Sequence, residues 1–188
     1  EAPLDVYLFE VSGGMLQRFA IAAALMMRPG LIVADEPTTA LDVTIQAQIL
    51  HLMREIRDEH GVAILLISHH LGVIAEICDR VVVMYAGRVV EEGPVETIFT
   101  APRHPYTRAL FACDPSLVPD TVRRLPVIAG EVARADAAGC AFAARCDHAT
   151  PLCRAKVPAL RPLSPEAEAD DGHAVACRLV PGAGEGGG

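Results

Sequence analysis

Apolar and polar positions follow two different periodicities in the first part of the chain. Apolar side chains recur every three or four positions over residues 12–28 and 43–59, which predicts two helices. Short, uninterrupted apolar runs at 31–34 and 62–67 are typical of buried strands in a parallel sheet. The pattern therefore predicts helices and strands in alternation.

A short helix and a hairpin follow. Residues 71–78 have helical spacing, and the runs at 80–85 and 88–93 flank Ala86-Gly87, a pair typical of a tight turn. Strand, helix, strand, helix and strand in this order predict an α/β fold, in which helices flank parallel strands and the hairpin lies at the sheet edge.

The second half has a different character. Residues 94–126 combine two short helical segments, "PVETIF" and "HPYTRALFAC", with several prolines. Residues 127–180 carry four cysteines and little periodicity, which indicates a small irregular module whose core needs further stabilisation. Residues 181–188, "PGAGEGGG", are expected to be a flexible tail.

Composition narrows the possible classes of protein. The chain has 188 residues, of which 52% are hydrophobic, and a formal net charge of −8, so neither disorder nor nucleic-acid binding is favoured. Its longest apolar run, 19–27, is too short for a membrane helix. Its acidic start has no basic region, so we do not interpret it as a secretory signal, and because it begins with Glu1 and not with Met, we expect it to start within a longer protein. The pair Glu91-Glu92 is interpreted as a solvated face of the hairpin.

Two clusters suggest phosphate chemistry. Ser12-Gly13-Gly14 opens a helix, where exposed N–H groups and the helix dipole suit an anion. Asp35-Glu36 ends an apolar strand, so both carboxylates are expected at the sheet edge where α/β proteins bind ligands. Four motifs follow one another at short spacings, and their order is a more specific signal than either cluster alone. They are "VSGGMLQR", "LIVADEP", "TTALD" and "LLISHH".

These four motifs resemble the signature motif, Walker B strand, D-loop and switch histidine of the nucleotide-binding subunits of ABC transporters, over about residues 10–93. The run "HPYTRALFA" and the cysteine-bearing tail resemble the oligopeptide/dipeptide importer branch, which includes nickel-uptake relatives. The resemblance implies a partial P-loop NTPase-type sheet in residues 1–93, a connector in 94–126 and the family's C-terminal extension in 127–180.

The resemblance also implies roles for individual residues. Asp35 is expected to hold Mg²⁺, Glu36 to act as general base on the attacking water, and His69 to contact the γ-phosphate. Asp42 would reach across a dimer interface, although it could also serve as a helix cap. The positions implied to bind ATP of a partner subunit, or to support that binding, are Ser12, Gly13, Gly14, Gln17 and Asp42.

The four cysteines supply a possible metal site. Cys140, Cys146, Cys153 and Cys177 are enough thiolates for a closed set of ligands, but their spacing matches neither a zinc finger nor a ferredoxin. Peptide importers of this branch can carry a 4Fe–4S cluster on their extension, so the resemblance favours that cluster, with zinc second. Reduced thiols without a metal are the remaining alternative.

The expected function is ATP hydrolysis that powers peptide import. No G-x-x-x-x-G-K-[ST] loop is present, so the chain alone is expected to be inactive. It would act at the cytoplasmic face of the inner membrane with a second nucleotide-binding subunit, transmembrane permease subunits and an extracytoplasmic solute-binding protein, and without nucleic acid. The alternative is a non-catalytic assembly module that completes a partner's ATP site. A soluble ABC-type ATPase of DNA repair or translation is disfavoured by the acidic balance.

Overall fold

The computed structural model of the chain contains two compact units, residues 1–77 and 78–188. Each is described separately below. The described residues are 7, 11–39, 41–115, 126–132, 138–163 and 172–180. The proline-rich stretch of the predicted connector lies mostly outside these ranges, and the tail predicted to be flexible lies wholly outside them.

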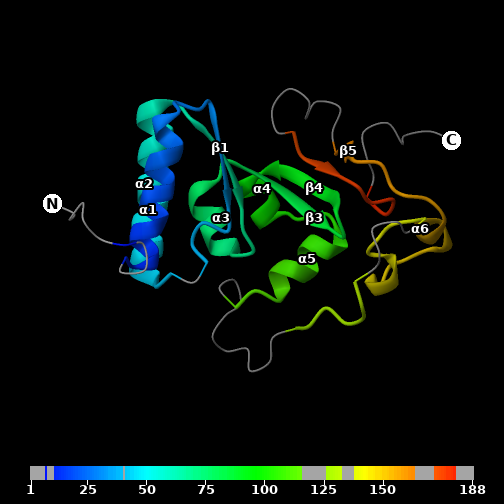
Figure 1. Ribbon diagram of the computed structural model, residues 1–188. Coiled ribbons are helices and arrows are strands. Elements are labelled where there is room, and N and C mark those ends of the chain that lie inside the picture. The colour runs from blue at the N-terminus through cyan, green and yellow to red at the C-terminus, as the bar shows by residue number, and fades with distance from the viewer. Residues whose placement is uncertain are drawn as a thin grey trace. The chain divides into compact units, whose positions relative to one another are not determined.

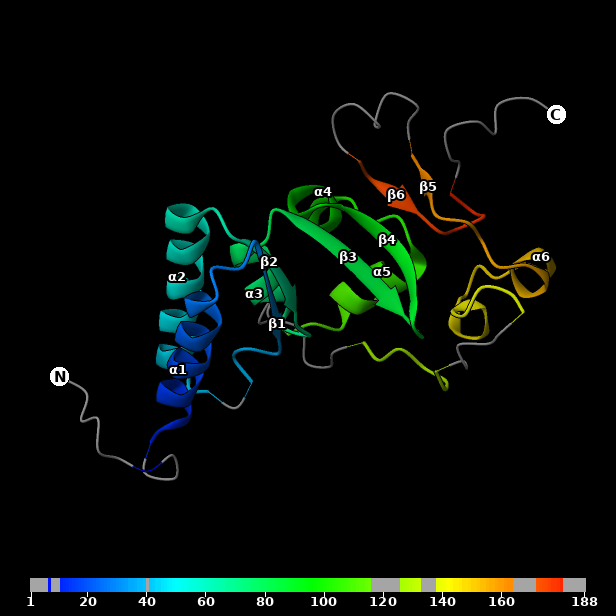
Figure 2. The same cartoon turned by 45° about the horizontal axis from the view of Figure 1, so that its top comes forward.

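Unit 1 alternates helices and strands. Its elements are α1 (Gly13–Met26), β1 (Leu31–Asp35), α2 (Val43–His60), β2 (Ala63–Ile67) and α3 (Leu71–Ile77). The two strands pair in parallel, with Leu31 opposite Ala63 and Asp35 opposite Ile67. The predicted α/β class is confirmed. Both strands run toward the end of the unit at which α1 and α2 begin (Figure 2).

Local signals in the sequence set the ends of these helices. Ser12 and Asp42 cap α1 and α2, because each side chain accepts the backbone N–H of the third residue along, at 3.4 and 2.9 Å. Gly61 ends α2 in the left-handed region, with φ of 63°, which a glycine adopts without strain. The first helix therefore begins on the serine of the glycine motif.

The core of unit 1 lies between α2 and α3. The apolar stripe predicted on α2 is buried, and α3 contributes three more buried side chains. These core residues are Ile49, Leu50, Met53, Ile56, Leu71, Val73 and Ile77. Arg54 and Arg57 add hydrogen bonds from α2 to the end of α3, where they contact the carbonyl oxygens of Glu76 and Ile77.

The prediction that both strands are buried is wrong for one face of the sheet. Leu31 and Val33 on β1 are 54% and 58% exposed, and Leu65 and Ile67 on β2 are 51% and 46% exposed. Side chains alternate between the two faces of a strand, and the described residues cover only one of these faces. Apolar side chains of α1, including Phe19, are exposed as well.

Unit 2 is built on an antiparallel sheet, not on an extension of the parallel one. The hairpin of β3 (Arg80–Tyr85) and β4 (Arg88–Pro94) turns at Ala86 and Gly87, both with positive φ, as predicted. However, β4 pairs on its other side with β6 (Ala174–Val175), and β6 pairs with β5 (Arg161–Pro162), which gives the order β3-β4-β6-β5 (Figures 1 and 2). The expectation of an edge hairpin on the parallel sheet is therefore corrected.

Short helices and a buried aromatic cluster complete unit 2. The helices are α4 (Val95–Thr100), α5 (Pro105–Ala112) and α6 (Pro151–Ala155), with a 3₁₀ turn, η2 (Ala143–Arg145). Tyr85 of β3 lies 4.6 Å from Tyr106 and 5.3 Å from Phe142 between ring centroids. These rings join the hairpin, α5 and the cysteine-containing segment. In the described ranges no helix has the length and apolarity needed to cross a bilayer.

Glu91 corrects the interpretation of the hairpin as a solvated acidic face. Its side chain is 0% exposed. Its carboxylate accepts the backbone N–H groups of Arg103 and His104 at 2.6 and 3.0 Å and lies 2.9 Å from Nε2 of His173. A buried carboxylate needs such partners, and Glu91 finds them because the loop before α5 and the segment before β6 fold over β4.

Candidate functional site

Glu36 and His69 form a polar pair where β1 and β2 end. Nδ1 of His69 lies 2.7 Å from Oε1 of Glu36, and the backbone N–H of His69 donates to the same oxygen at 3.2 Å. Thr39 donates its hydroxyl to Oε2 at 2.8 Å. Since parallel strands place their carboxyl ends at one edge, residues 33 positions apart meet there.

The backbone and charge of Glu36 are both unusual. Its φ is +46°, a conformation rare for a residue other than glycine and often found at functional sites. Its N–H donates to the carbonyl of Ile67 at 2.9 Å, which holds this turn against β2. Hydrogen bonds from His69 and Thr39 lower the pKa of the Glu36 carboxyl, so it stays ionised at neutral pH.

The other predicted ATP-site residues lie nearby in the chain but on separate elements. Asp35 is exposed as the last residue of β1. Ser12 and Gly13 are exposed at the start of α1, Gly14 is buried, and Gln17 is half-buried one turn further on. Asp42 acts as the cap of α2, which was the simpler of the two roles considered for it.

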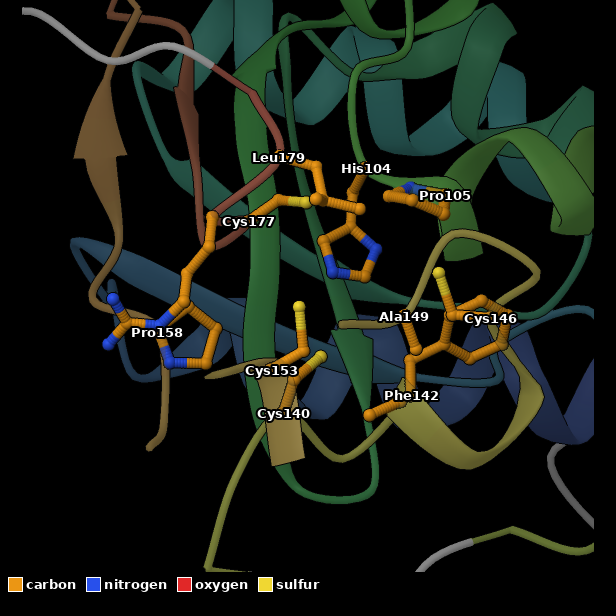
Figure 3. Close-up of a pocket in the computed structure, with 12 residues that line it drawn as sticks. His104, Pro105, Cys140, Phe142, Cys146, Ala149, Cys153, Pro158, Cys177 and Leu179 are labelled. Atoms are coloured by element: carbon orange, nitrogen blue, oxygen red, sulfur yellow. The ribbon is translucent and has the colours of Figure 1, made fainter. Parts of the chain in front are cut away.

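The four candidate cysteine ligands line one cavity in unit 2 (Figure 3). Three of these cysteines lie in the segment around η2 and α6, whereas Cys177 follows β6. The tertiary structure therefore brings the last thiol to the same cavity as the first three. The rest of the wall is mostly apolar and includes Phe142, Pro158 and Leu179. The pattern of spacings alone did not predict this convergence.

The thiols differ in their electrostatic surroundings. Burial raises the pKa of Cys140 and of Cys177, and repulsion from neighbouring cysteines of the same set adds to the rise. Hydrogen bonding with Thr150, whose Oγ1 lies 3.2 Å from Sγ, lowers the pKa of Cys153. Cys153 is therefore the thiol most readily ionised among these three.

The four thiols line one cavity but do not form a compact single-ion site among the described residues. Within the described part of the chain, no three His, Cys, Asp or Glu side chains are close enough to hold a single metal ion. Four thiols around one cavity are a suitable donor set for a polynuclear cluster, which spaces its ligands further apart than a single tetrahedral zinc.

Two further residues at this cavity were missed from the sequence. His104, in the "HPY" run, is 1% exposed, and burial lowers its pKa to about 4. Its Nδ1 accepts the N–H of Tyr106 at 3.0 Å and caps α5, with Pro105 in the first turn. Arg178 follows Cys177 directly and also lines the cavity. A histidine just before a proline at a helix start is a recognisable cap position, but the cavity depends on the fold.

Two family profiles match the chain. The family described as "Oligopeptide/dipeptide transporter, C-terminal region" matches residues 90–153, and one described as an AAA domain matches residues 4–75. The first match includes most of β4, all of α4, α5 and η2 and part of α6, together with three of the four cavity cysteines.

Curated proteins match over most of the chain. "Probable peptide ABC transporter ATP-binding protein y4tR" of Sinorhizobium fredii is 51% identical, over 94% of this chain and 52% of that protein. "Dipeptide transport ATP-binding protein DppD" of Escherichia coli is 50% identical, over 86% of this chain and 50% of that protein. The chain thus spans about half the length of these relatives.

A solved structure is also similar in sequence. The protein cbiO1 from Clostridium perfringens, described as part of the ABC transporter complex cbiONQ, is 35% identical, with a TM-score of 0.46 over 48% of this chain and 36% of that one.

Proposed function

Because the chain belongs to the ATP-binding proteins of ABC transporters, in the peptide and dipeptide import family, we propose that it forms part of an ATPase that powers peptide import. The observation that carries this proposal is the Glu36–His69 pair at the carboxyl ends of two parallel strands. A base and a positioning histidine are what water attack on a phosphate requires from a protein.

Glu36 is the general base in this proposal. Its Oε1 already has two donors, both from His69, whereas Oε2 has only the Thr39 hydroxyl among the hydrogen bonds described. A carboxylate oxygen can accept two hydrogen bonds, so Oε2 can accept one more from a water molecule. The lowered pKa keeps the carboxylate ionised and ready to take the proton of that water.

His69 and Asp35 complete the catalytic set. An ionised carboxylate only accepts, so Nδ1 of His69 donates to Glu36 and Nε2 is the nitrogen left for the substrate. Nε2 donates to a γ-phosphate oxygen when both ring nitrogens carry protons. Asp35, exposed beside this pair in the chain, would hold Mg²⁺, which supplies positive charge to the phosphates when bound.

The start of α1 contributes to the ATP site of a second nucleotide-binding subunit. Ser12 and Gly13 are exposed there, and the N-terminus of a 14-residue helix favours a phosphate. Gln17 supports this surface one turn along the same helix. Asp42 caps α2, and in this proposal it would also reach across the interface to the partner subunit.

The cavity of Cys140, Cys146, Cys153 and Cys177 holds a 4Fe–4S cluster in this proposal. Support comes from the four thiols that line one cavity and from the match of this segment to the transporter C-terminal family. The cluster supplies four metal–thiolate bonds to a segment with little core of its own. Zinc on the same thiols remains the second choice.

The partners of the complete transporter follow from the family. The subunit pairs with a second ATP-binding subunit and docks on permease subunits at the cytoplasmic face of the inner membrane, and a solute-binding protein on the other side selects the peptide. The Escherichia coli relative, of which this chain covers 50%, is named for dipeptide transport. Dipeptides are therefore the first substrates to test.

The proposal is tested by replacing the matching half of an intact peptide-importer ATP-binding subunit with this chain, so that Glu36 shares a polypeptide with a G-x-x-x-x-G-K-[ST] loop, and measuring phosphate release by this hybrid subunit. Glu36→Gln should lower the activity that depends on the chain by about 10²–10⁴-fold, because the amide cannot take the proton of water. Gly13→Asp should also abolish it, since a carboxylate at the helix start repels the phosphate. Glu55→Gln, on the outer side of α2, is the matched control and should have no effect.

The variants separate the two functions considered for the chain. Loss of activity in both Glu36→Gln and Gly13→Asp supports catalysis by this chain. Loss only in Gly13→Asp supports the alternative, a non-catalytic module that completes the partner's ATP site. A hybrid subunit that carries the wild-type chain and releases no phosphate contradicts both.

A further inference from the structure

The hydrogen bond to Tyr106 determines which nitrogen of His104 carries the proton. Nδ1 accepts the backbone N–H of Tyr106 at 3.0 Å, so this nitrogen has no proton. A neutral imidazole with an accepting Nδ1 must carry its proton on Nε2. Nε2 is therefore a donor, and it is buried without a hydrogen-bond partner.

Arg178 presents a second buried donor without a partner. Its Nε always carries a proton, because the guanidinium does not lose its charge in proteins. In the described residues three buried side-chain polar atoms lack a hydrogen bond, and they are Nε2 of His104, Oγ1 of Thr107 and Nε of Arg178. Two of the three belong to residues that line the four-cysteine cavity.

The cavity itself offers these donors few acceptors other than sulfur. Figure 3 shows the His104 ring pointing into the space among the labelled cysteines. Proline, alanine, leucine and phenylalanine side chains form most of the remaining wall, and none of them accepts a hydrogen bond. Buried donors without acceptors are rare and costly in folded proteins, so an acceptor is expected within the cavity.

We propose that Nε2–H of His104 and Nε–H of Arg178 donate hydrogen bonds to sulfur atoms of the cluster bound by the four cysteines. The inference rests on the cluster proposed above. When a bound cluster takes up one electron, no bond to a ligand forms or breaks and its negative charge increases by one. N–H donors aimed at its sulfur atoms stabilise the more negative form, so they raise the reduction potential.

The test uses the full chain, reconstituted without oxygen from iron and sulfide, and titrated with dithionite as the one-electron reductant. His104→Asn removes the Nε2 donor, while the asparagine oxygen can still cap α5. Arg178→Lys keeps the charge and removes the Nε donor. Each variant should shift the equilibrium between reduced and oxidised cluster about tenfold toward the oxidised form, which is about 59 mV for one electron.

Arg154→Lys is the matched control, because Arg154 also follows a cavity cysteine but is exposed. It should leave the potential at the wild-type value. Iron content shows whether each variant holds the cluster, and circular dichroism shows whether it is folded. If His104→Asn fails either check, the potential of Arg178→Lys alone tests the inference. A loaded variant with an unchanged potential overturns the inference and leaves the cluster standing. A wild-type chain without the absorption and spin signals of a 4Fe–4S cluster overturns both.

Discussion

The two glycines at the start of α1 are needed for different physical reasons. A Cβ on Gly14 would overlap Cγ2 of Ile45, so this glycine allows α1 to pack against α2. A Cβ on Gly13 would lie 3.5 Å from Leu41, which is an ordinary contact. Steric need therefore explains Gly14, and the proposed approach of a phosphate is the remaining reason for a glycine at position 13.

Gly14→Ala should destabilise the contact of α1 with α2 by roughly 1–3 kcal/mol, because the methyl group overlaps a branched side chain. Gly13→Ala should be neutral or slightly stabilising, since alanine is the better helix former. Hydrogen exchange of the amides of α1 and α2 measures both changes. Equal protection in the two variants would contradict the packing role of Gly14.

At the scale of elements, a buried carboxylate positions the start of α5. Glu91 on β4 accepts the N–H groups of the two residues that precede Pro105, and it contacts His173 before β6. His104 then caps α5 through its own ring. A single residue of the hairpin therefore determines where the "HPY" segment lies, and with it the donor that faces the cysteine cavity.

Glu91→Gln should destabilise unit 2 by roughly 1–3 kcal/mol, because an amide replaces one acceptor oxygen with a donor and leaves a buried N–H unpaired. Glu92→Gln is the matched control, because Glu92 is the next residue along and its side chain is only half-buried. This substitution should change the free energy of unfolding by less than about 0.5 kcal/mol. Urea unfolding followed by circular dichroism measures the difference. A similar midpoint for both variants would show that Glu91 contributes no more than a surface acid.

At the scale of the whole chain, distant segments converge on the cavity of unit 2. Cys140, Cys146 and Cys153 lie in one segment, whereas His104 and Cys177 come from positions more than 20 residues away on either side. Short elements such as the two-residue strands β5 and β6 provide few hydrogen bonds of their own. A bound cluster would therefore stabilise this unit in particular.

Removal of the proposed cluster should lower the stability of unit 2 and leave unit 1 unchanged. Cys153→Ser, or iron removal with a chelator, should increase hydrogen exchange in β5, β6 and α6 by about tenfold or more, whereas α2 keeps its protection. Cys113→Ser replaces a cysteine that does not line the cavity and serves as the control. An increase of the same size in α2 would contradict the independent response of the two units.

The sequence by itself determined the local structure and the parts of the proposed ATP site that lie within short motifs. Ser12, Asp42 and Gly61 begin or end helices through contacts within a few residues, and Ala86-Gly87 turns the hairpin in the same way. The two apolar runs predict two parallel strands, of which the first is followed by acidic residues and the second by histidines. These features depend on neighbouring residues, whose pattern is visible without the fold.

Only the tertiary structure decided which side chains are buried and which distant groups meet. Glu91 is predicted from the sequence to be a surface acid, yet two segments fold over it, whereas Leu31 and Val33 are predicted to be core and are exposed in the described part of the chain. The convergence of four cysteines with His104 and Arg178 on one cavity is likewise absent from any local pattern. Burial and long-range contacts depend on how the elements pack against one another. The same local sequence can therefore be buried in one fold and exposed in another.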